Sequence, residues 1–196
     1  MLDAALTAFA EQGYSGTSVR DLCRRLGVSH NLVHQRYRSK EALWYAAVDR
    51  GFAALAFELG DALSKAPDDD LARLRAVLVR FLEVSAAWPA LLKIMNQESA
   101  APGPRLDYLF ERHIAPASWL VTGVLRRLHR QGRVRDVAPA TFHFLLTHGA
   151  GGVLSLTALT DRFARTFDPA VDRRTPDGVR RYAEDVVELL LAGMLI

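Results

Sequence analysis

Two short helical patterns separated by one glycine occupy residues 17–40, and they constrain the fold more than any other stretch. Ser18 can cap the first pattern, since its hydroxyl can accept from the free amides of the first turn while Asp21 answers three residues on. Gly27 ends that helix, because the residue just past a helix commonly needs a positive φ that only glycine reaches cheaply. Ser29 can cap the second helix. The stretch predicts a helix, a tight turn and a second helix.

The charge and the polar residues of this stretch favour nucleic acid as its partner. Residues 17–40 hold six basic residues and one acidic residue, a local net charge of +5, whereas the whole chain carries only +3. Arginine and lysine that neutralise phosphates provide most sequence-independent DNA affinity. The predicted core positions are Val19, Leu22, Cys23, Leu26, Val33 and Tyr37, and the remaining faces of the second helix carry His30, Asn31, Leu32, His34, Gln35 and Arg36. The pattern predicts a DNA-binding helix-turn-helix.

Plainer interpretations of the same residues stay open. Amphipathic helix pairs joined by glycine occur in many helical proteins, and charged residues often mark only a solvated face. The context favours DNA binding, because one helix precedes the pair and Ser39-Lys40-Glu41 starts another directly after it. Leu32 could pack inward instead of facing DNA. Lys40 could be ordinary solvated charge, but it lies in the first turn of a helix, where phosphate binds, and we favour a phosphate contact.

Several segments of the first fifty residues together resemble the TetR family of transcriptional repressors. They are Ala4-Ala5 through Phe9, Gly13-Tyr14, Thr17-Ser18-Val19-Arg20-Asp21-Leu22, Leu26-Gly27-Val28-Ser29 and Ser39-Lys40-Glu41-Ala42-Leu43. The resemblance implies a homodimer with an N-terminal DNA-binding domain and a larger helical regulatory domain. It also implies a small-molecule effector that releases a repressor from a double-stranded DNA operator.

Position by position, the resemblance places roles on individual residues. Phosphate contacts fall on Ser18, Arg20, His34 and Lys40, and base contacts on His30, Asn31, Leu32, Gln35 and Arg36, with Ser29 at the start of the reading helix. Gln35 or Asn31 could pair with adenine, Arg36 could reach guanine or a phosphate, and Leu32 could meet a thymine methyl group. Three positions depart from the family pattern: His34 replaces the usual tyrosine, Leu32 a small hydroxyl residue, and Arg38 a common proline. The operator sequence stays open.

Composition limits the remaining classes of protein. The chain has 196 residues, half of them hydrophobic, which is enough for a core, and no apolar stretch approaches the roughly 18 residues that span a bilayer. We expect a soluble, cytoplasmic protein without a membrane partner. Cys23, the single cysteine, is expected to pack in a helix core, with redox sensing as the alternative. A helical scaffold without DNA affinity is a further alternative.

No catalytic, metal or cofactor site is expected. The sequence contains no glycine-rich phosphate loop, no H-E-x-x-H motif and no cysteine or histidine pair at metal-ligand spacing. An enzyme would need a carboxylate beside His113 or His148, and Glu98 and Glu111 are the candidates.

Beyond residue 50 the chain shows helical periodicity and no alternating strand pattern. We predict an all-α fold of about nine helices, with a DNA-binding domain at 1–45 and a ligand-binding and dimerisation domain at 46–196. The expected rear helices cover residues 40–63, 71–88, 90–96, 105–131, 139–160 and 177–196. Residues 161–176 are expected to form a solvated loop. Pro116 should kink or break its helix.

A kink beside an apolar helix face suggests a ligand cavity near His113. The candidate lining residues are Phe81, Trp88, Met95, Tyr108, Phe110, His113, Trp119, Phe144 and His148. The alternative is that the aromatic residues form plain core and that His113 is a hydrogen-bonded core histidine. In the expected mechanism the effector shifts the Trp88–Met95 helix or the Pro116 kink, which moves the helix that begins at Lys40.

The last two expected helices suggest a dimer interface. Glycines inside a helix each cost about 1 kcal/mol against alanine, and close approach of a neighbouring helix would offset this. The candidate interface residues are Gly149, Gly152, Tyr182, Val186 and Leu190. The alternative is that the glycines break the helix.

Overall fold

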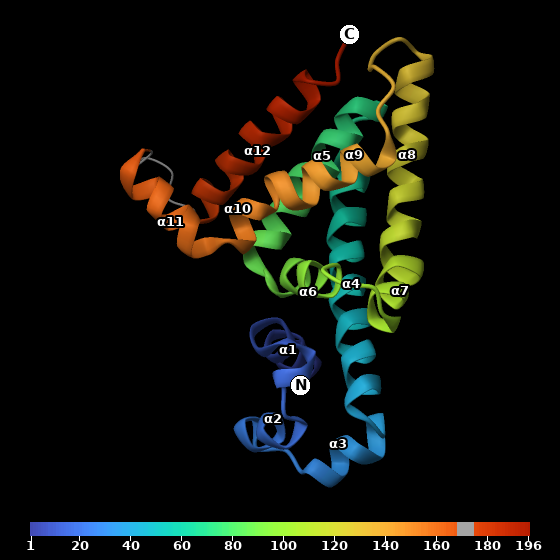
Figure 1. Ribbon diagram of the computed structural model, residues 1–196. Helices are drawn as coiled ribbons and strands as arrows, with labels where there is room; N and C mark the ends of the chain where they lie inside the picture. The colour runs from blue at the N-terminus through green and yellow to red at the C-terminus, as the bar shows by residue number, and fades with distance from the viewer. Residues whose placement is uncertain (168–174) are drawn as a thin grey trace.

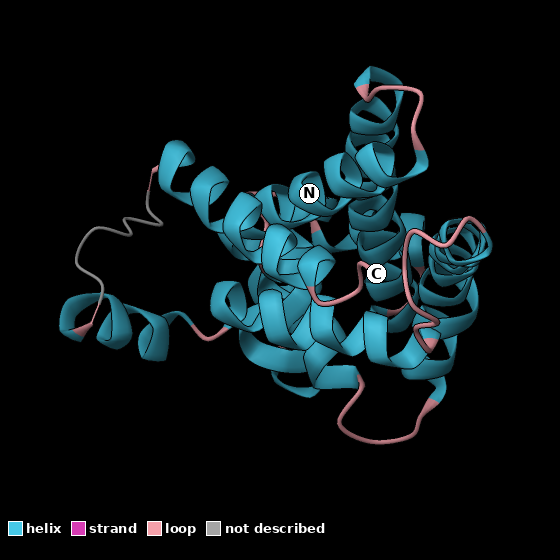
Figure 2. Cartoon of the chain, turned by 90° about the horizontal axis from the view of Figure 1, so that it is seen from above, coloured by secondary structure: helices cyan, strands magenta, loops and turns pink. Residues whose placement is uncertain are grey.

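The computed structural model describes residues 1–167 and 175–196, and these residues form helices joined by short connections (Figures 1 and 2). The helices are α1 (Leu2–Gly16), α2 (Val19–Leu26), α3 (His30–Tyr37), α4 (Lys40–Lys65), α5 (Asp70–Ala87), α6 (Ala90–Glu98), α7 (Pro104–Leu109), α8 (Ala115–Arg130), α9 (Pro139–Phe144), α10 (Gly152–Ser155), α11 (Thr157–Thr166) and α12 (Pro176–Ala192). Two π-helical turns, η1 (Phe110–Ile114) and η2 (Leu145–Ala150), join α7 to α8 and α9 to α10. Counting each joined set once gives ten continuous helices in the described residues, so the all-α prediction is confirmed.

Helix α4 is the spine of the molecule (Figure 1). Ser39 caps it by accepting from the Ala42 amide at 3.0 Å, and the helix ends just before Pro67. Its 26 residues span about 39 Å at 1.5 Å per residue. α4 packs on α1 at one end and on α5 at the other, so it connects the small N-terminal bundle to the larger rear bundle.

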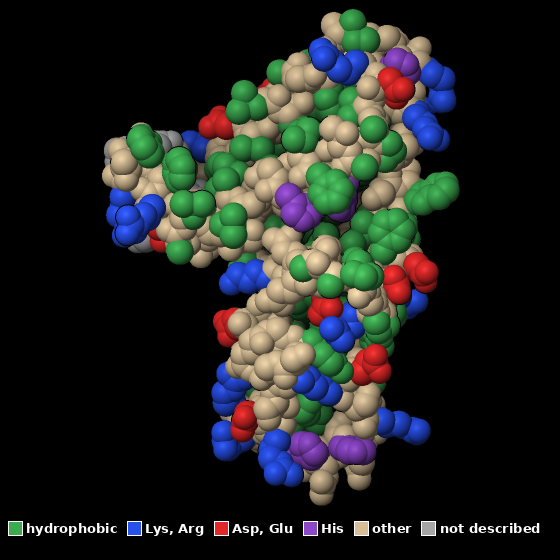
Figure 3. All heavy atoms as spheres, in the orientation of Figure 1, with side chains coloured by type: hydrophobic (Ala, Val, Ile, Leu, Met, Phe, Trp, Pro, Cys, Tyr) green, Lys and Arg blue, Asp and Glu red, His purple; other side chains and the backbone are tan. Residues whose placement is uncertain are grey.

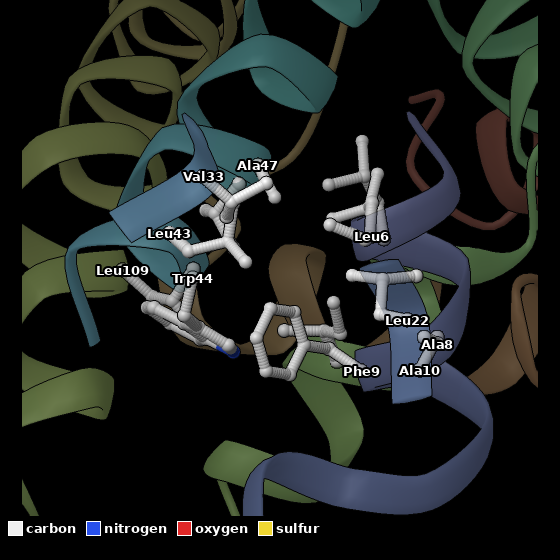
Figure 4. Packing of buried hydrophobic residues seen from close by; sticks show 14 of the residues in the cluster. Leu6, Ala8, Phe9, Ala10, Leu22, Val33, Leu43, Trp44, Ala47 and Leu109 are labelled. Atoms are coloured by element: carbon white, nitrogen blue, oxygen red, sulfur yellow. The ribbon is translucent and has the colours of Figure 1, made fainter. Parts of the chain in front are cut away.

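Two hydrophobic cores lie along this spine. In the first, Phe9 of α1 and Trp44 of α4 are almost completely buried, and Figure 4 shows the Phe9 ring directed toward Trp44, with Leu22 and Val33 from α2 and α3 in the same cluster. The second core joins α5, α8 and α12 through residues such as Leu82, Leu128 and Val187. Leu91 and Ile94 of α6 pack into the first core, so the two bundles share a continuous apolar contact.

The helix containing Pro116 does not break. A π-helical turn precedes the proline, and the Ala115 amide donates to the Phe110 carbonyl five residues back. The extra residue in such a turn shifts the hydrogen-bond register where proline supplies no amide hydrogen. The helix is therefore not broken at Pro116: a π turn lies inside one continuous helix from Pro104 to Arg130.

The segment after Pro139 differs from its predicted bounds. The helix continues through Gly149 and Gly152, so the glycines do not break it, but it ends at Ser155. Leu156 leaves helical geometry, and α11 follows at an angle of 77°. The solvated loop predicted at 161–176 is wrong up to Thr166, which still belongs to α11, while residues 168–174 lie outside the described part of the chain.

The C-terminal helix α12 stops at Ala192 and not at Ile196. The last residues instead form an isolated antiparallel bridge between Leu195 and Val134, and the Arg135 amide donates to the Met194 carbonyl at 2.8 Å.

Among the described helices, none is by itself long and apolar enough to cross a membrane. The bent pair 139–155 and 157–166 meets the criteria of length and composition only when both helices are taken together.

Candidate nucleic-acid interface

Helices α2 and α3 form the predicted helix-turn-helix with its expected termini. The Ser18 hydroxyl accepts from the Asp21 amide at 3.2 Å, and Gly27 adopts the left-handed conformation (φ 64°, ψ 24°). The Asp21 carboxylate does not return to Ser18 but pairs with Arg24 at 2.8 Å. Ser29 is the residue before α3, yet its side chain makes no capping hydrogen bond. Ser29 is exposed at the N-terminus of α3.

Val33 anchors α3 in the first core, and the polar side chains of α3 project from the helix into solvent. Val33 is buried in the first core, whereas His30, Asn31, His34, Gln35 and Arg36 are exposed. Leu32 is 60% exposed, so the alternative in which it packs inward is wrong. Figure 3 shows lysine, arginine and histidine side chains at the end of the molecule formed by α2 and α3. This end presents a convex, positively charged helix surface.

Three arginines of α2 face solvent. Arg24 is paired with Asp21, whereas Arg20 and Arg25 form no ion pair within the described residues. Leu26, predicted in the core stripe, is 37% exposed because it is the last residue of the helix, beside the turn. Cys23 is buried among core residues, as predicted from its position.

Arg38 explains one departure from the family pattern. It ends α3 with a φ of 61°, the only positive φ outside glycine in the described residues. Proline fixes φ near −65°, so it cannot occupy this position in the observed conformation.

Lys40 lies between the interface and α1. Its ammonium group donates to the Ser15 carbonyl at 3.3 Å and lies 4.7 Å from the centre of the Tyr14 ring. Burial, and then repulsion from Arg105, lowers the pKa of Lys40 below its ordinary value. In this conformation Lys40, which is predicted to contact a phosphate, is held by the C-terminal end of α1.

The rear bundle contacts α1 through two polar side chains that sequence reasoning missed. The Arg105 guanidinium of α7 lies 4.0 Å from the Tyr14 ring centre and pairs with Glu98 at 2.9 Å. The Gln97 amide of α6 donates to the Ala10 carbonyl at 2.9 Å. No motif marks these residues, because their partners lie up to 91 positions away in the sequence and one of them is a backbone carbonyl.

His113 belongs to a cluster around Asp49 of α4. Asp49 accepts from the Tyr108 hydroxyl at 2.9 Å and contacts His113 Nε2 at 2.8 Å, and the His113 ring stacks on Phe52 at 4.2 Å. Burial lowers the pKa of His113 despite the carboxylate beside it, and burial together with Asp49 raises the pKa of Tyr108 to about 12. The structure places His113 as a hydrogen-bonded histidine at a helix contact. Its carboxylate partner is Asp49 and neither Glu98 nor Glu111.

The other predicted ligand residues belong to several elements of the rear bundle. Phe81 is half-buried beside the second core, Met95 is buried, and Trp88 is half-exposed at the end of α5. Phe144 and His148 of the α9–η2 segment have ring centres 5.2 Å apart, and Phe110 and Trp119 are exposed. Tyr108 and His113 remain at Asp49. Their convergence on an effector stays a prediction.

Four of the five predicted interface residues lie around one groove. Gly149, Tyr182, Val186 and Leu190 line one open, largely apolar groove of about 750 Å³ between α9–η2 and α12. Leu145 and Leu189, more than half exposed, lie in the same groove, whereas Gly152 is not among its lining residues. A Cβ atom added at Gly149 or Gly152 would meet nothing within 4 Å.

The described residues contain no group of three or more histidine, cysteine, aspartate or glutamate side chains placed to hold a metal ion.

Comparison with known proteins agrees with this geometry. Residues 1–47 match the family model described as bacterial regulatory proteins, tetR family. The HTH-type transcriptional regulator RutR of Escherichia coli O157:H7 is 27% identical over 156 residues, which cover 74% of this chain and 71% of that protein. This relative is described as a transcriptional regulator, which agrees with the expectation of a regulator and not of an enzyme.

Solved structures share the whole fold. A putative fatty acid metabolism regulator of Clostridium perfringens superposes with a TM-score of 0.73 at 19% identity, covering 100% of this chain and 98% of the other. The transcriptional regulator FadR of Bacillus subtilis, in complex with stearoyl-CoA, gives 0.71 at 15% identity, covering 98% and 96%. With its helix-turn-helix, its matching N-terminal segment and this shared fold, the chain is similar to DNA-binding transcriptional regulators of the TetR family.

Proposed function

We propose that this regulator is a cytoplasmic repressor that binds a palindromic operator as a homodimer and is released by a small apolar or amphipathic effector. The observation that carries the proposal is the reading face of α3, where five polar residues and Leu32 are exposed around the buried anchor Val33. Such a face offers donors, acceptors and one apolar group to base edges. We assign phosphate contacts to Ser18, Arg20, His34 and Lys40.

A domain boundary near residue 45 fits this function. Residues 1–45 contribute α1, α2, α3 and the first turns of α4, and residues 46–196 contribute the rear bundle. Because α4 crosses the boundary without interruption, a movement in the rear bundle reaches α3 through one rigid element.

The groove between α9–η2 and α12 supports dimerisation. One recognition helix reads too few base pairs for a specific site, and a pair of them about 34–36 Å apart reads successive major-groove turns. A second copy of the chain, related by a twofold axis, would bury Leu145 and Leu189 in the facing groove.

The contacts between α1 and the rear bundle support release by an effector. Gln97 and Arg105 attach α6 and α7 to α1, and Tyr108 and His113 attach α7 and η1 to α4. An effector that binds the released arrangement more tightly shifts the population toward it, and only this difference in affinity matters. FadR, which shares the fold, is solved with an acyl-CoA, and this favours an amphipathic effector.

Selection of bound sequences from random duplex DNA tests the proposal. We expect a palindrome whose affinity falls steeply with salt, because phosphate contacts release counterions. Gln35→Ala should lose discrimination at one base pair of each half-site, at a cost of about 1–3 kcal/mol. Gln131→Ala, an exposed glutamine after α8, is the matched control and should bind as the wild type does. Selection of no sequence would contradict the operator-binding role.

A further inference from the structure

A cavity of about 330 Å³ lies where the DNA-binding bundle meets the rear bundle, between α1, α4 and the corner that joins α5 to α6. Leu6, Gly51 and Leu91 form part of its apolar floor. A Cβ atom at Gly51 would lie 2.8 Å from a methyl group of Leu6 and 2.9 Å from one of Leu91, so the side chains of these two leucines pack directly on Gly51. The volume falls at the lower end of small-molecule pockets, about 300–1,000 Å³. It suits a ligand of amino-acid size.

The charges of the cavity come from different helices. α1 contributes the carboxylates of Asp3 and Glu11, while α4 and α6 contribute the cations of Arg50 and Lys93. Arg50 and Asp3 are separated by 3.6 Å and both are more than half exposed, a pair that contributes little. Within the described residues, the side chains of Glu11 and Lys93 form no hydrogen bond or ion pair. Both signs of charge are therefore available to a ligand.

Trp88 supplies an aromatic surface beside these charges. The residue ends α5, lines the cavity and is 50% exposed. When an apolar group covers a large aromatic side chain that is half exposed to water, the burial lowers the free energy.

We propose that this cavity binds a small zwitterion with an apolar group, of the chemical class of a hydrophobic amino acid. The ligand carboxylate faces Arg50 and Lys93, its ammonium group faces Asp3 and Glu11, and its apolar part covers Trp88 and the floor. The site goes beyond the proposed effector, because of the residues predicted for that effector only Trp88 lines this cavity. An occupant here contacts α1, α4 and α6 at once and ties the DNA-binding bundle to the rear bundle.

Three probes that share a phenyl group test the charge requirement on the full chain by isothermal titration calorimetry. L-Phenylalanine carries both charges, 3-phenylpropionate only the carboxylate, and phenethylamine only the ammonium group. We expect L-phenylalanine to bind at least about tenfold more tightly than either of the others, since each loses one set of charge-assisted contacts. Equal affinities for the three probes, or no binding of L-phenylalanine, would overturn the proposal.

Variants locate the binding. Lys93→Gln should weaken the binding of L-phenylalanine about tenfold and leave the binding of phenethylamine unchanged. Glu11→Gln should also weaken the binding of L-phenylalanine about tenfold, but it should leave the binding of 3-phenylpropionate unchanged. Ala54→Phe fills the cavity from its lining and should abolish binding of all three probes. Lys65→Gln, an exposed lysine at the far end of α4, is the matched control. Unchanged L-phenylalanine affinity in both Lys93→Gln and Ala54→Phe would place the probe elsewhere and refute the site.

Thermal unfolding of each variant without probe confirms that it folds, and Lys93→Gln and Glu11→Gln change side chains that make no polar contact in the described residues. Operator binding is measured on the same samples. A protein that binds L-phenylalanine but selects no DNA sequence contradicts the proposed function alone, and a protein that selects an operator but binds no probe contradicts this inference alone.

Discussion

At the scale of single residues, backbone strain is concentrated at Arg38. A non-glycine residue in a sparsely populated φ/ψ region costs about 1–3 kcal/mol, and the surrounding structure must support it. Arg38 connects α3 to the Ser39 cap of α4, so the strain fixes the angle at which the reading helix leaves the spine.

Replacing Arg38 should therefore change stability according to backbone conformation and not charge. We expect Arg38→Gly to raise the free energy of unfolding by about 1 kcal/mol, since glycine reaches a φ of 61° without a Cβ clash. Arg38→Ala keeps the Cβ atom and should leave stability nearly unchanged, whereas Arg38→Pro should destabilise by about 3 kcal/mol or more. Urea unfolding of the three variants measures this. Equal effects of Gly and Ala would show that the side chain, and not φ, sets the energy.

His113 gives the second prediction at this scale. Burial lowers its pKa below the ordinary value of 6.5, while the hydrogen bond and the charge of Asp49 raise it and Arg112 lowers it. The unfolded chain therefore binds a proton more readily than the folded chain does, so the contribution of His113 to stability is full above about pH 6.5 and is lost as the pH falls through and below that value. The free energy of unfolding should decline as the pH falls from about 7.5 to the folded pKa.

Asp49→Asn separates the two causes. It removes the interactions that raise the pKa of His113 and leaves burial in place, so NMR titration of the imidazole should give a lower pKa than in the wild type. Asp61→Asn, which changes a carboxylate at the other end of α4, should leave that pKa unchanged. A higher pKa in Asp49→Asn would mean that Asp49 does not raise the pKa of His113.

At the scale of elements, serines that precede helices in the same way differ in whether they cap the helix. Ser18, Ser29 and Ser39 all precede helices, but only Ser18 and Ser39 accept a capping hydrogen bond. The sequence predicted caps at Ser18 and Ser29 and a helix start at Ser39-Lys40-Glu41, because a serine precedes each helical pattern. The outcome depends on side-chain rotamers, which a single sequence does not specify.

Alanine substitution at two of these serines should therefore have unequal effects. Ser39→Ala should lower the free energy of unfolding by about 1 kcal/mol, since the Ala42 amide loses its acceptor. Ser29→Ala should cost only a few tenths of a kcal/mol because no capping bond is lost. Thermal unfolding followed by circular dichroism compares them, and a cost of about 1 kcal/mol at Ser29 would contradict the observed geometry.

For the other elements, hydrophobic periodicity predicted that a helix is present better than it predicted where the helix begins and ends. The amphipathic pattern of residues 105–131 was sufficient to predict one helix, and Pro116 correctly marked its irregularity, although the chain absorbs the proline in a π turn. The break at Leu156 carries no glycine or proline, so no local signal predicts the 77° bend that begins α11. The Asp49 cluster joins residues 59 and 64 positions apart, and only tertiary packing brings them together.

At the scale of the whole molecule, the two bundles have different relations to solvent. The DNA-binding bundle buries most of its apolar residues, and Leu32 on the exposed face of α3 is more exposed than Met1 or Leu26, its other exposed large apolar residues. The rear bundle leaves Leu145 and Leu189 more than half exposed in the groove against α12. An exposed apolar groove at the end opposite to the reading helix indicates an unsatisfied surface, and a second copy is the partner that the proposed function requires.

Charge in this groove should therefore separate the protomers. We expect Leu189→Glu to give a monomer in sedimentation velocity experiments, because a twofold interface would place the new carboxylate in both facing grooves without a partner. Phe57→Glu is the matched control, since Phe57 of α4 is as exposed (74% each) but lies outside the groove, and it should leave the dimer intact. The monomer should retain weak, salt-dependent binding to any duplex while losing most of its preference for the selected palindrome, because each protomer alone reads only one half-site. A Leu189→Glu protein that sediments as a dimer would move the interface to another face, and a wild-type protein that sediments as a monomer would contradict dimerisation itself.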